Sequence, residues 1–479
     1  MAMARATFNE KYKTIHPGYA RLTEFVNITA AKVDIFNKYT EAELEHHTKY
    51  ITDFVRTICS GFRDYNEVFK TKEPIPSGSY IDKTKIISPT EYDFLNPLSL
   101  SDDASVQVCD VRGDCDLAGQ GYGVVNIHPG QLQQLLLDHH STKFYDVLIK
   151  HSPYEVIPHS SHDSLGAPGD VSWLTTNISG SLHAAMHTYL ENTHGSHYIG
   201  ERYHKKEQHP SYTLGKFSMN VGLHGPSVWL RVGGPLGTTD IDLCFCMQGT
   251  EGSVLVPIDP YCSKCPFAIH WTESIVQTPH PAPDHQLHNP TGHHKQLFLV
   301  LKYISHLYSR IHWHIYNEPP PYGLISSYSC KLLIMNHQKC CTRSDFSIRR
   351  CFEDVVEYIF NQFRRDEDDS NQYRLGVGGE FIYLPDTYYP DREVEVVDGY
   401  GNSVELTVLL WVLKHVKHSS DTQWWQKLLD DDFPNNVSSG DVLLQSLLDS
   451  VKHVRDAIRQ HEPLDWQHED GKRTHLTIT

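Results

Sequence analysis

The stretch 76–94, PSGSYIDKTKIISPTEYDF, constrains this chain more than any other part of its sequence. It joins a turn of small residues, Ser77-Gly78-Ser79, to a segment in which one residue separates two acids, Glu91 and Asp93. Alternate residues of a strand project from the same face, so a strand here would carry both carboxylates on one side, about 7 Å apart along the backbone. We therefore expect an acidic strand face next to a tight turn.

Neighbouring carboxylates are suitable ligands for Mg²⁺, which proteins hold through one or two carboxylates together with substrate phosphates. The backbone N–H groups and hydroxyls of a Gly-Ser turn can bind those phosphates, and glycine allows close approach because it has no Cβ. Taken alone, Glu-x-Asp on an edge strand and Gly-Ser in a turn are common structural features. Their joint spacing favours a site for a nucleoside triphosphate with Mg²⁺ or Mn²⁺.

A third acid comes from a later stretch with strand character, DIDLCFCM at 240–247. Its two aspartates, Asp240 and Asp242, share a face if the strand is regular. Asp242 lies between Ile241 and Leu243, which is typical of a buried strand that carries one catalytic acid. We favour Asp242 as the metal ligand and keep Asp240 as the alternative; two acids at the entrance of a strand are the structural explanation.

The composition indicates a globular chain and argues against several classes of protein. The 479 residues, 39% hydrophobic and 21% charged, suffice for two lobes. No apolar run could span a bilayer, the N-terminus lacks the apolar region of a secretory signal, and eleven cysteines without framework spacing favour reduced thiols. We expect a cytoplasmic protein without a membrane partner. The net charge of −17 argues against a generally basic nucleic-acid binder, but allows a local basic face.

Helical periodicity marks the N-terminal region and much of the chain beyond residue 295. From Thr29 to about Arg63, apolar residues at three- and four-residue spacings predict one long amphipathic helix, with Thr29 or Asn27 as its N-cap. Ser326 or Ser327 is the expected N-cap of a later helix. The helices expected after residue 295 cover 297–307, 326–335, 351–363, 406–416 and 440–459.

A lone C-x-x-C pair, Cys262 and Cys265, could form half of a zinc site. His270 or a run of later histidines would have to complete it, and two thiols in a polar loop are the alternative. Because the spacing fits no zinc signature, we assign no zinc site from the sequence. The later histidines are His280, His285, His288, His293 and His294.

Four segments, in this order, resemble one protein family: SGSY…PTEYDF, the DIDL strand, HWTES, and LISSYSCK followed by RRCFEDVVEYIFNQF. They are similar to the cyclic GMP-AMP synthase and cGAS-like receptor family of Mab-type nucleotidyltransferases, over residues 77–363. The resemblance implies an α+β, bilobed fold. A polymerase-β-like mixed sheet with a long spine helix would form a lobe at 1–270, and a helical lobe would form at 271–479, with nucleotides in the cleft between them.

The resemblance also implies roles for individual residues. Gly78 and Ser79, with Ser77 in the same turn, would bind the triphosphate, and Glu91, Asp93 and Asp242 would hold two metal ions. Tyr328 would stack on a base. The remaining contacts to phosphate or base would come from Ser274, Lys302, Ser327 and Lys331.

Three departures from the family bear on the activating ligand and the nucleotide preference. Thr272 stands where the family has an arginine, which removes one expected phosphate contact. The interval before the lysine helix holds histidines, but not the Cys-Cys pattern of the zinc ribbon that the family's synthase carries. The interval between Asp93 and Asp242 is also longer than we expect.

From these features we expect an enzyme, a metal-dependent nucleotidyltransferase that makes a cyclic dinucleotide second messenger from ATP and/or GTP and acts as an innate immune sensor. The alternatives are a catalytically silent nucleotide-binding or scaffold protein of the same fold, and a nucleotidyltransferase acting on RNA ends. Residues 295–365 hold ten basic and five acidic residues. This excess predicts double-stranded RNA as activator through Lys339, Arg343, Arg349 and Arg350, unless it is only a solvated face. We also expect a homodimer on activation.

Overall fold

The computed structural model divides the chain into two compact units. We call them the sheet unit, Lys38–His285 with Pro385–Arg392, and the helical unit, Met1–Asn37 with Gln286–Leu384 and Glu393–Thr479. The structure describes residues 17–66, 69–99, 106–111, 115–127, 171–204, 211–248, 254–257, 270–274, 290, 292–317, 326–341, 348–362, 372–375, 382–386, 389, 391–397, 408–410, 412–413, 415–417, 424–438, 440–460, 464–467 and 473–478.

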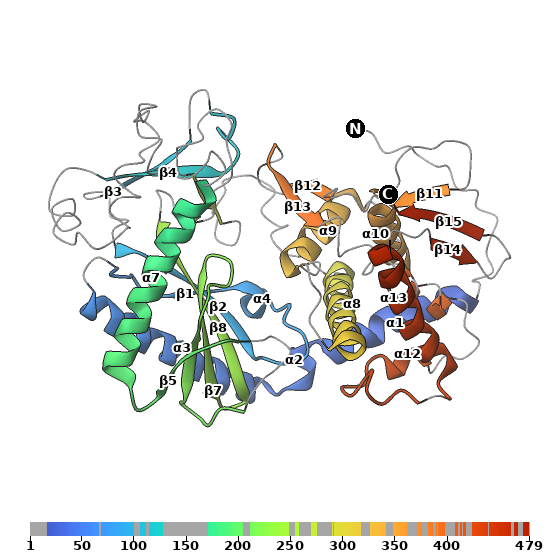
Figure 1. The fold of residues 1–479 in the computed structure, drawn as a ribbon, viewed down its shortest axis with the longest axis horizontal. Coiled ribbons are helices and arrows are strands. Elements are labelled where there is room, and N and C mark those ends of the chain that lie inside the picture. Colours follow the sequence, from blue (N-terminus) through green and yellow to red (C-terminus); the bar gives the residue numbers. More distant parts are fainter. Residues whose placement is uncertain are drawn as a thin grey trace. The chain divides into compact units, whose positions relative to one another are not determined.

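The sheet unit contains a ten-stranded mixed sheet (Figure 1). Its main path runs β3-β4-β10-β9-β8-β7-β6-β5, and β2 pairs with both β8 and β1 away from that path. The strands are β1 (Ile75–Ser77), β2 (Glu91–Pro97), β3 (Val106–Asp110), β4 (Tyr122–Ile127), β5 (Tyr198–Arg202), β6 (Phe217–Asn220), β7 (Ser227–Gly234), β8 (Gly237–Gln248), β9 (Val254–Val256) and β10 (Trp271–Glu273).

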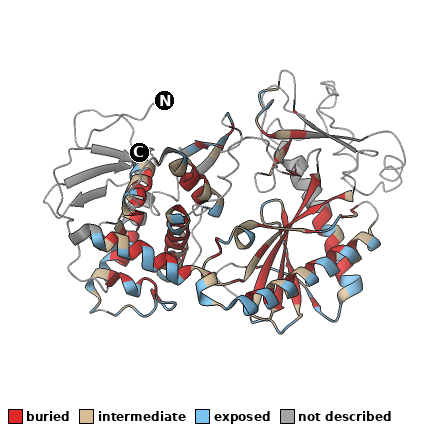
Figure 2. Cartoon of the chain, turned by 180° about the vertical axis from the view of Figure 1, so that it is seen from behind, coloured by how far each residue is buried: buried red, intermediate tan, exposed pale blue. Residues whose placement is uncertain are grey.

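Two long helices, α3 (Glu41–Tyr65) and α7 (Val171–His194), pack against this sheet. The apolar positions of α3 recur every three or four residues, so one side of the helix is buried while the other is exposed, as Figure 2 shows. These side chains join those of α7 and the strands in one core, which includes Ile51, Val55, Phe62, Met186, Leu190, Leu230 and Leu243. This core holds β7 and β8 in place at the centre of the unit.

The predicted N-terminal helix is real but is divided, so the single helix capped at Asn27 or Thr29 is wrong. Helix α1 (Pro17–Val33) begins earlier, the short α2 (Ile35–Lys38) follows, and α3 starts afresh after Thr40. The Thr40 side chain accepts a hydrogen bond from the Glu43 N–H, and the Glu43 carboxylate accepts one from the Thr40 N–H. This capping box gives side-chain acceptors to backbone N–H groups at the start of α3, so α3 can begin as a separate helix.

The helical unit is built from α1 and the helices that follow the sheet. Helix α8 (Gly292–Tyr316) packs against α1, α9 (Ser327–Cys340), α10 (Ile348–Gln362) and α13 (Val442–Gln460). The Ser326 hydroxyl caps α9 by accepting a hydrogen bond from the Ser329 N–H at 3.0 Å. Ser326 is one of the two residues predicted as the N-cap of this helix. The remaining elements are α12 (Trp424–Lys427), β12 (Ile382–Pro385) paired with β13 (Glu393–Val397), and a small sheet of β11 (Gln372–Leu375), β14 (Leu464–Gln467) and β15 (Arg473–Ile478).

The segment Pro385–Arg392 belongs to the sheet unit although helical-unit residues precede and follow it. The buried Arg392 side chain donates to the Gly121 carbonyl at 3.2 Å and to the Asp386 carboxylate at 2.7 Å. Tyr389 donates to the Glu273 carboxylate. By these contacts, the sheet unit extends to residue 285 and also includes this short segment. The sequence, in contrast, suggests one boundary after residue 270.

The mixed sheet and the separate set of helices make this an α+β protein, as predicted. Among the helices that the structure describes, none is long and apolar enough to cross a membrane.

Candidate functional site

The acids predicted to bind metal meet through the pairing of β2 with β8, which lie side by side in the sheet (Figure 1). The two strands run parallel, with Glu91 opposite Asp240 and Asp93 opposite Asp242. Residues in register on adjacent strands project to the same side of a sheet, as do residues two apart on one strand. All four carboxylates therefore project from one face, which we call the acidic face.

The Gly-Ser turn lies directly beside the acidic face. Ser77, the last residue of β1, is opposite Asp93, and the single-turn helix α4 (Gly78–Ile81) follows it. Gly78 has a φ of +73°, and a Cβ added to it would lie 1.8 Å from Oδ2 of Asp93. Only glycine allows the backbone to approach this carboxylate so closely. The turn and the acids, which are close in the sequence, are therefore also close in the structure.

Asp240 is bound by a buried arginine. Arg231 lies opposite Asp240 on β7 and is 1% exposed. Its Nε donates to Oδ1 of Asp240 at 2.6 Å, and its Nη2 donates to Oδ2 at 3.0 Å. Such a bidentate pair holds both oxygens of the carboxylate and fixes its orientation. This geometry favours Asp242 over Asp240 as a metal ligand.

Asp242 is buried and contacts a histidine that sequence reasoning did not find. The Nδ1 atom of His224 lies 2.9 Å from Oδ2 of Asp242, and the His224 ring packs near Trp229, with 5.3 Å between ring centroids. His224 comes from the turn before β7, where no motif marks it. A partly exposed imidazole therefore stands next to the acid that we favour as a metal ligand.

Glu91 has a cationic partner, Lys85, in the loop that precedes β2. The Lys85 side chain is buried and forms an ion pair with the Glu91 carboxylate, and nothing in the sequence pattern indicated this contact. With Glu91 bound to Lys85 and Asp242 to His224, the three carboxylates do not form a closed ligand cluster among the described residues. Their hard oxygen donors fit Mg²⁺ or Mn²⁺, which readily share such ligands with water and phosphate.

A thiol adjoins the acids but is chemically inert. Cys244 follows Asp242 by two residues on β8, so both project from the same face. Burial raises the pKa of the Cys244 thiol to about 12, and the charges of Asp242 and Asp93 act in the same direction. Because thiols react as thiolates, Cys244 is not a nucleophile at neutral pH.

The other predicted contacts are divided between the two units. Ser274, in the sheet unit, follows β10, and its N–H donates to the Val254 carbonyl at 2.7 Å. Lys302 is buried in α8, with its Nζ 5.5 Å from the centre of the Phe298 ring. Ser327 is exposed at the start of α9, where Tyr328 and Lys331 are partly buried.

The C-x-x-C pair, Cys262 and Cys265, lies outside the described residues, as do His280, His285 and His288. His270 is near Cys115 in the sheet unit, with 3.6 Å between Nε2 and Sγ. His293 and His294 are in the first turn of α8.

No protein-family model matches the chain, and no curated protein sequence matches it significantly. Among solved structures, the structure of E. coli MS115-1 CdnC with ATP aligns with 87% of this chain and 98% of its own, at 12% identity and a TM-score of 0.42. At this identity and TM-score, the similarity establishes neither an activity nor a ligand for this chain.

Proposed function

We propose that this chain is a metal-dependent nucleotidyltransferase that joins ATP and/or GTP into a cyclic dinucleotide. The observation that carries the proposal is the register of β2 and β8, which places Glu91, Asp93 and Asp242 on one face, next to Gly78. Three carboxylates beside a Gly-Ser turn suit the binding of a metal-bound triphosphate.

Each step of the proposed reaction forms one phosphodiester bond and releases one pyrophosphate. The ribose hydroxyl of the acceptor attacks the α-phosphorus of the donor, and a second attack by the linear product closes the ring. Mg²⁺ or Mn²⁺ held by Glu91, Asp93 and Asp242 would lower the pKa of the hydroxyl and offset the charge of the departing pyrophosphate.

In this proposal, the residues of the chain bind and orient the nucleotides and accept the proton of the attacking hydroxyl. The turn at Ser77-Gly78-Ser79 would hold the triphosphate through N–H groups and hydroxyls, and Asp242 would take the hydroxyl proton, directly or through water. Arg231 holds Asp240 and so supports the register of β8. On the helical unit, Lys302 would contact phosphate and Tyr328 would stack on a base. Ser327 and Lys331 would contact phosphate or base.

The experiment is incubation of the purified chain with four radiolabelled nucleoside triphosphates and Mg²⁺ or Mn²⁺, followed by phosphatase treatment and chromatography. We expect a small phosphatase-resistant product from the wild type and none from Glu91→Ala with Asp93→Ala, because loss of metal ligands removes several kcal/mol of transition-state stabilisation. The control pair, Glu45→Ala with Asp64→Ala, removes two exposed acids of α3 and should leave synthesis unchanged.

The outcomes separate the proposed function from its alternatives. Normal synthesis by a folded Glu91/Asp93 variant would contradict the metal assignment. A chain that binds ATP but never incorporates it would support the silent alternative, for which the partners Lys85 and His224 already occupy the acids. Extension of added RNA in place of a cyclic product would support a nucleotidyltransferase acting on RNA ends.

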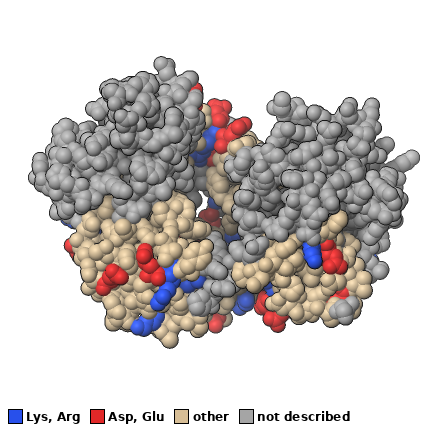
Figure 3. Space-filling model, viewed as in Figure 1, with Lys and Arg blue, Asp and Glu red and all other residues tan. Residues whose placement is uncertain are grey.

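For the activator, we propose double-stranded RNA bound through the helical unit, with dimerisation on binding. Lys339 and Arg350 are exposed and Arg349 is partly buried, while Arg343 lies outside the described residues. On the face drawn in Figure 3, described basic and acidic side chains are interspersed, so the support comes from these few residues and from the charge count.

Lys339→Glu with Arg350→Glu tests this activator more cleanly than Arg349→Glu, since both side chains are exposed. RNA-stimulated synthesis should be abolished, and in the wild type it should fall steeply between low and physiological salt. A light-scattering mass measurement with and without RNA checks the dimer. Synthesis that is indifferent to RNA, DNA, salt and the charge reversals would exclude a nucleic-acid activator.

A further inference from the structure

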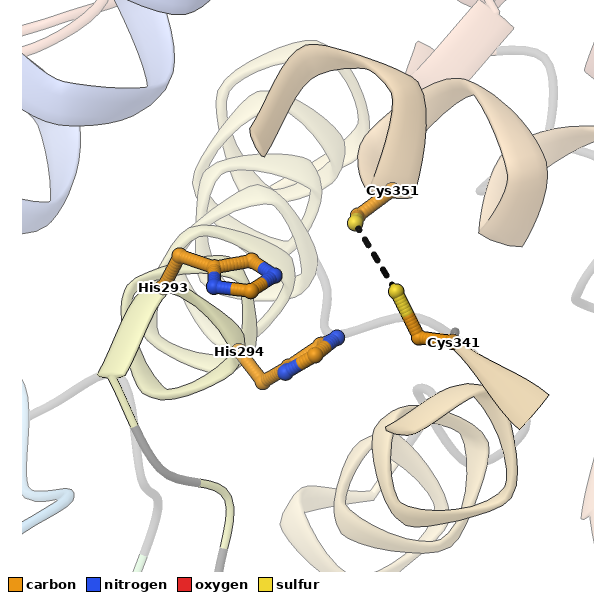
Figure 4. A group of neighbouring side chains, drawn as sticks. All are labelled: His293, His294, Cys341 and Cys351. Carbon is orange, nitrogen blue, oxygen red and sulfur yellow. Dashed lines mark hydrogen bonds between the residues drawn. The ribbon is translucent and has the colours of Figure 1, made fainter. Parts of the chain in front are cut away.

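Four side chains that can bind a metal meet in the helical unit, and they come from three helices or helix ends. His293 and His294 come from the first turn of α8, Cys341 follows the end of α9, and Cys351 is in the first turn of α10. Their ligand atoms all lie within 4.8 Å of one another. Figure 4 shows both rings and both sulfur atoms pointing toward one another between the three helices. We call this group the His–Cys cluster.

The distance between the two sulfur atoms suits a shared metal ion. The Sγ atoms of Cys341 and Cys351 are 3.8 Å apart, well beyond the bonding distance of a disulfide, and both cysteines are reduced. In a tetrahedral zinc site with Zn–S distances of about 2.3 Å, two sulfur ligands are about 3.8 Å apart. The sulfur atoms therefore already have the spacing of two corners of such a site.

One histidine of the cluster has a buried ring nitrogen that a metal ion could bind. His294 is 6% exposed, and its Nε2 is a buried atom without a hydrogen-bond partner among the described residues. A buried nitrogen left in this way destabilises the fold, and a metal bond would offset this cost. An imidazole binds a metal ion through such a ring nitrogen.

We propose that His293, His294, Cys341 and Cys351 bind Zn²⁺ in a closed, four-coordinate structural site. Two imidazoles and two thiolates are a set of donors that zinc prefers, and two thiolates balance the charge of the ion. Because protein side chains fill all four positions, the site has no place for a substrate or water, and its role is structural. Carboxylates do not take part, so the cluster does not compete for Mg²⁺.

The position of the cluster indicates what the ion would stabilise. It joins the start of α8, the end of α9 and the start of α10, three helices that pack against one another. Lys302 lies on α8, and Tyr328 and Lys331 lie on α9, so zinc would hold together the helices that carry these predicted nucleotide contacts. The zinc site itself does not depend on the proposed catalysis.

Metal analysis of the full chain, purified with reductant and without chelator, tests the proposal. We expect about one zinc ion per chain in the wild type and almost none in Cys341→Ser with Cys351→Ser. The matched control is Cys330→Ser, a buried cysteine of α9 that is outside the cluster and should leave the zinc content unchanged. A chelator should lower the melting temperature of the wild type and of the control.

A second measurement keeps the proposal testable if the double variant does not fold. Co²⁺ added to the chelator-treated wild type should give the absorption of a tetrahedral ion with thiolate ligands, and His293→Ala should weaken it. A wild type that holds no zinc and gives no thiolate–cobalt band would overturn the proposal. So would a folded double variant that retains its zinc, or a Cys341–Cys351 disulfide in the protein purified without reductant.

Discussion

The acidic face of the sheet unit and the His–Cys cluster of the helical unit hold their ligand atoms in different ways. On the acidic face, the carboxylates are bound by protein partners, Lys85 at Glu91 and His224 at Asp242. In the His–Cys cluster, the donors face one another, and Nε2 of His294 is buried without a partner among the described residues.

We infer that the acidic face suits a metal ion that exchanges, whereas the His–Cys cluster suits a metal ion that stays bound and stabilises the fold. Oxygen ligands that the protein can also bind through its own cations suit an ion that arrives and leaves with a substrate, as Mg²⁺ does with phosphates. Sulfur and nitrogen ligands from three helices suit an ion that stays bound. Its loss would remove the metal bonds of buried polar atoms and the link between the helices. The predictions below test this contrast, beginning with the largest expected effect.

The two aspartates of β8 should separate activity from stability. Asp242→Asn should reduce synthesis at least about 100-fold with little change in melting temperature, since it removes a proposed metal ligand. Asp240→Asn should reduce synthesis less but lower the free energy of unfolding by about 3–5 kcal/mol, because it leaves the buried Arg231 without its anion. Nucleotide incorporation and chemical denaturation measure the two effects. The reverse order would mean that Asp240 is the ligand.

Gly78→Ala should damage the acidic face without removing a charge. The new Cβ would have to displace the Asp93 carboxylate, which is 1.8 Å away, and a shift of about 1 Å at a catalytic group can cost about 100-fold in rate. The control is Gly119→Ala, which has a similar φ of +75° but no atom within 4 Å of the added Cβ. Both variants bear the backbone strain, so equal losses of synthesis in steady-state assays would show that strain alone is responsible.

The sheet unit should lose stability in mild acid through His47. This buried ring contacts the Pro89 carbonyl through Nε2 at 2.9 Å and accepts from the Leu236 N–H through Nδ1 at 3.3 Å, an arrangement that requires the neutral form. Burial lowers the pKa of His47 from 6.5 to about 4. The unfolded chain therefore binds more protons in this range, and stability falls as the pH drops from about 6.5 through about 4.

Urea unfolding between pH 7 and pH 4 measures this effect, with a chelator present so that loss of the proposed zinc does not contribute. His47→Gln keeps a donor and an acceptor but cannot titrate, so its unfolding free energy should change less with pH, by about 3 kcal/mol over the range. Identical pH profiles for the two proteins would assign the acid sensitivity to other groups.

The smallest expected effect is at Tyr328, on the helix that ends at the His–Cys cluster. Tyr328→Ala should weaken nucleotide binding by about 1–2 kcal/mol, whereas Tyr328→Phe should bind almost normally, because stacking needs the ring and not the hydroxyl. Equilibrium binding of ATP and GTP measures both variants. Equal losses would instead indicate a hydrogen-bonding tyrosine, and zinc content should be normal in both.

Short-range patterns account for the parts of the molecule that the sequence predicted well. The two-residue period placed Glu91 and Asp93 on one face, and apolar flanks identified Asp242 on a buried strand. The break between α1 and α3 was missed, because helical periodicity alone hides it, although Thr40 and Glu43 have the spacing of a capping box.

The α+β class came from the resemblance to a known family, whereas the sequence by itself determined the acidic strands and the turn beside them, since each depends on the order of neighbouring residues. Only the tertiary structure decided that Arg231 binds Asp240 and that His224 and Lys85 contact the other acids. It likewise decided the His–Cys cluster, in which α8 and α9 separate the histidines from the cysteines and the spacing matches no zinc signature. The physical reason is that packing brings distant side chains together, and local periodicity carries no information about which distant surfaces pack.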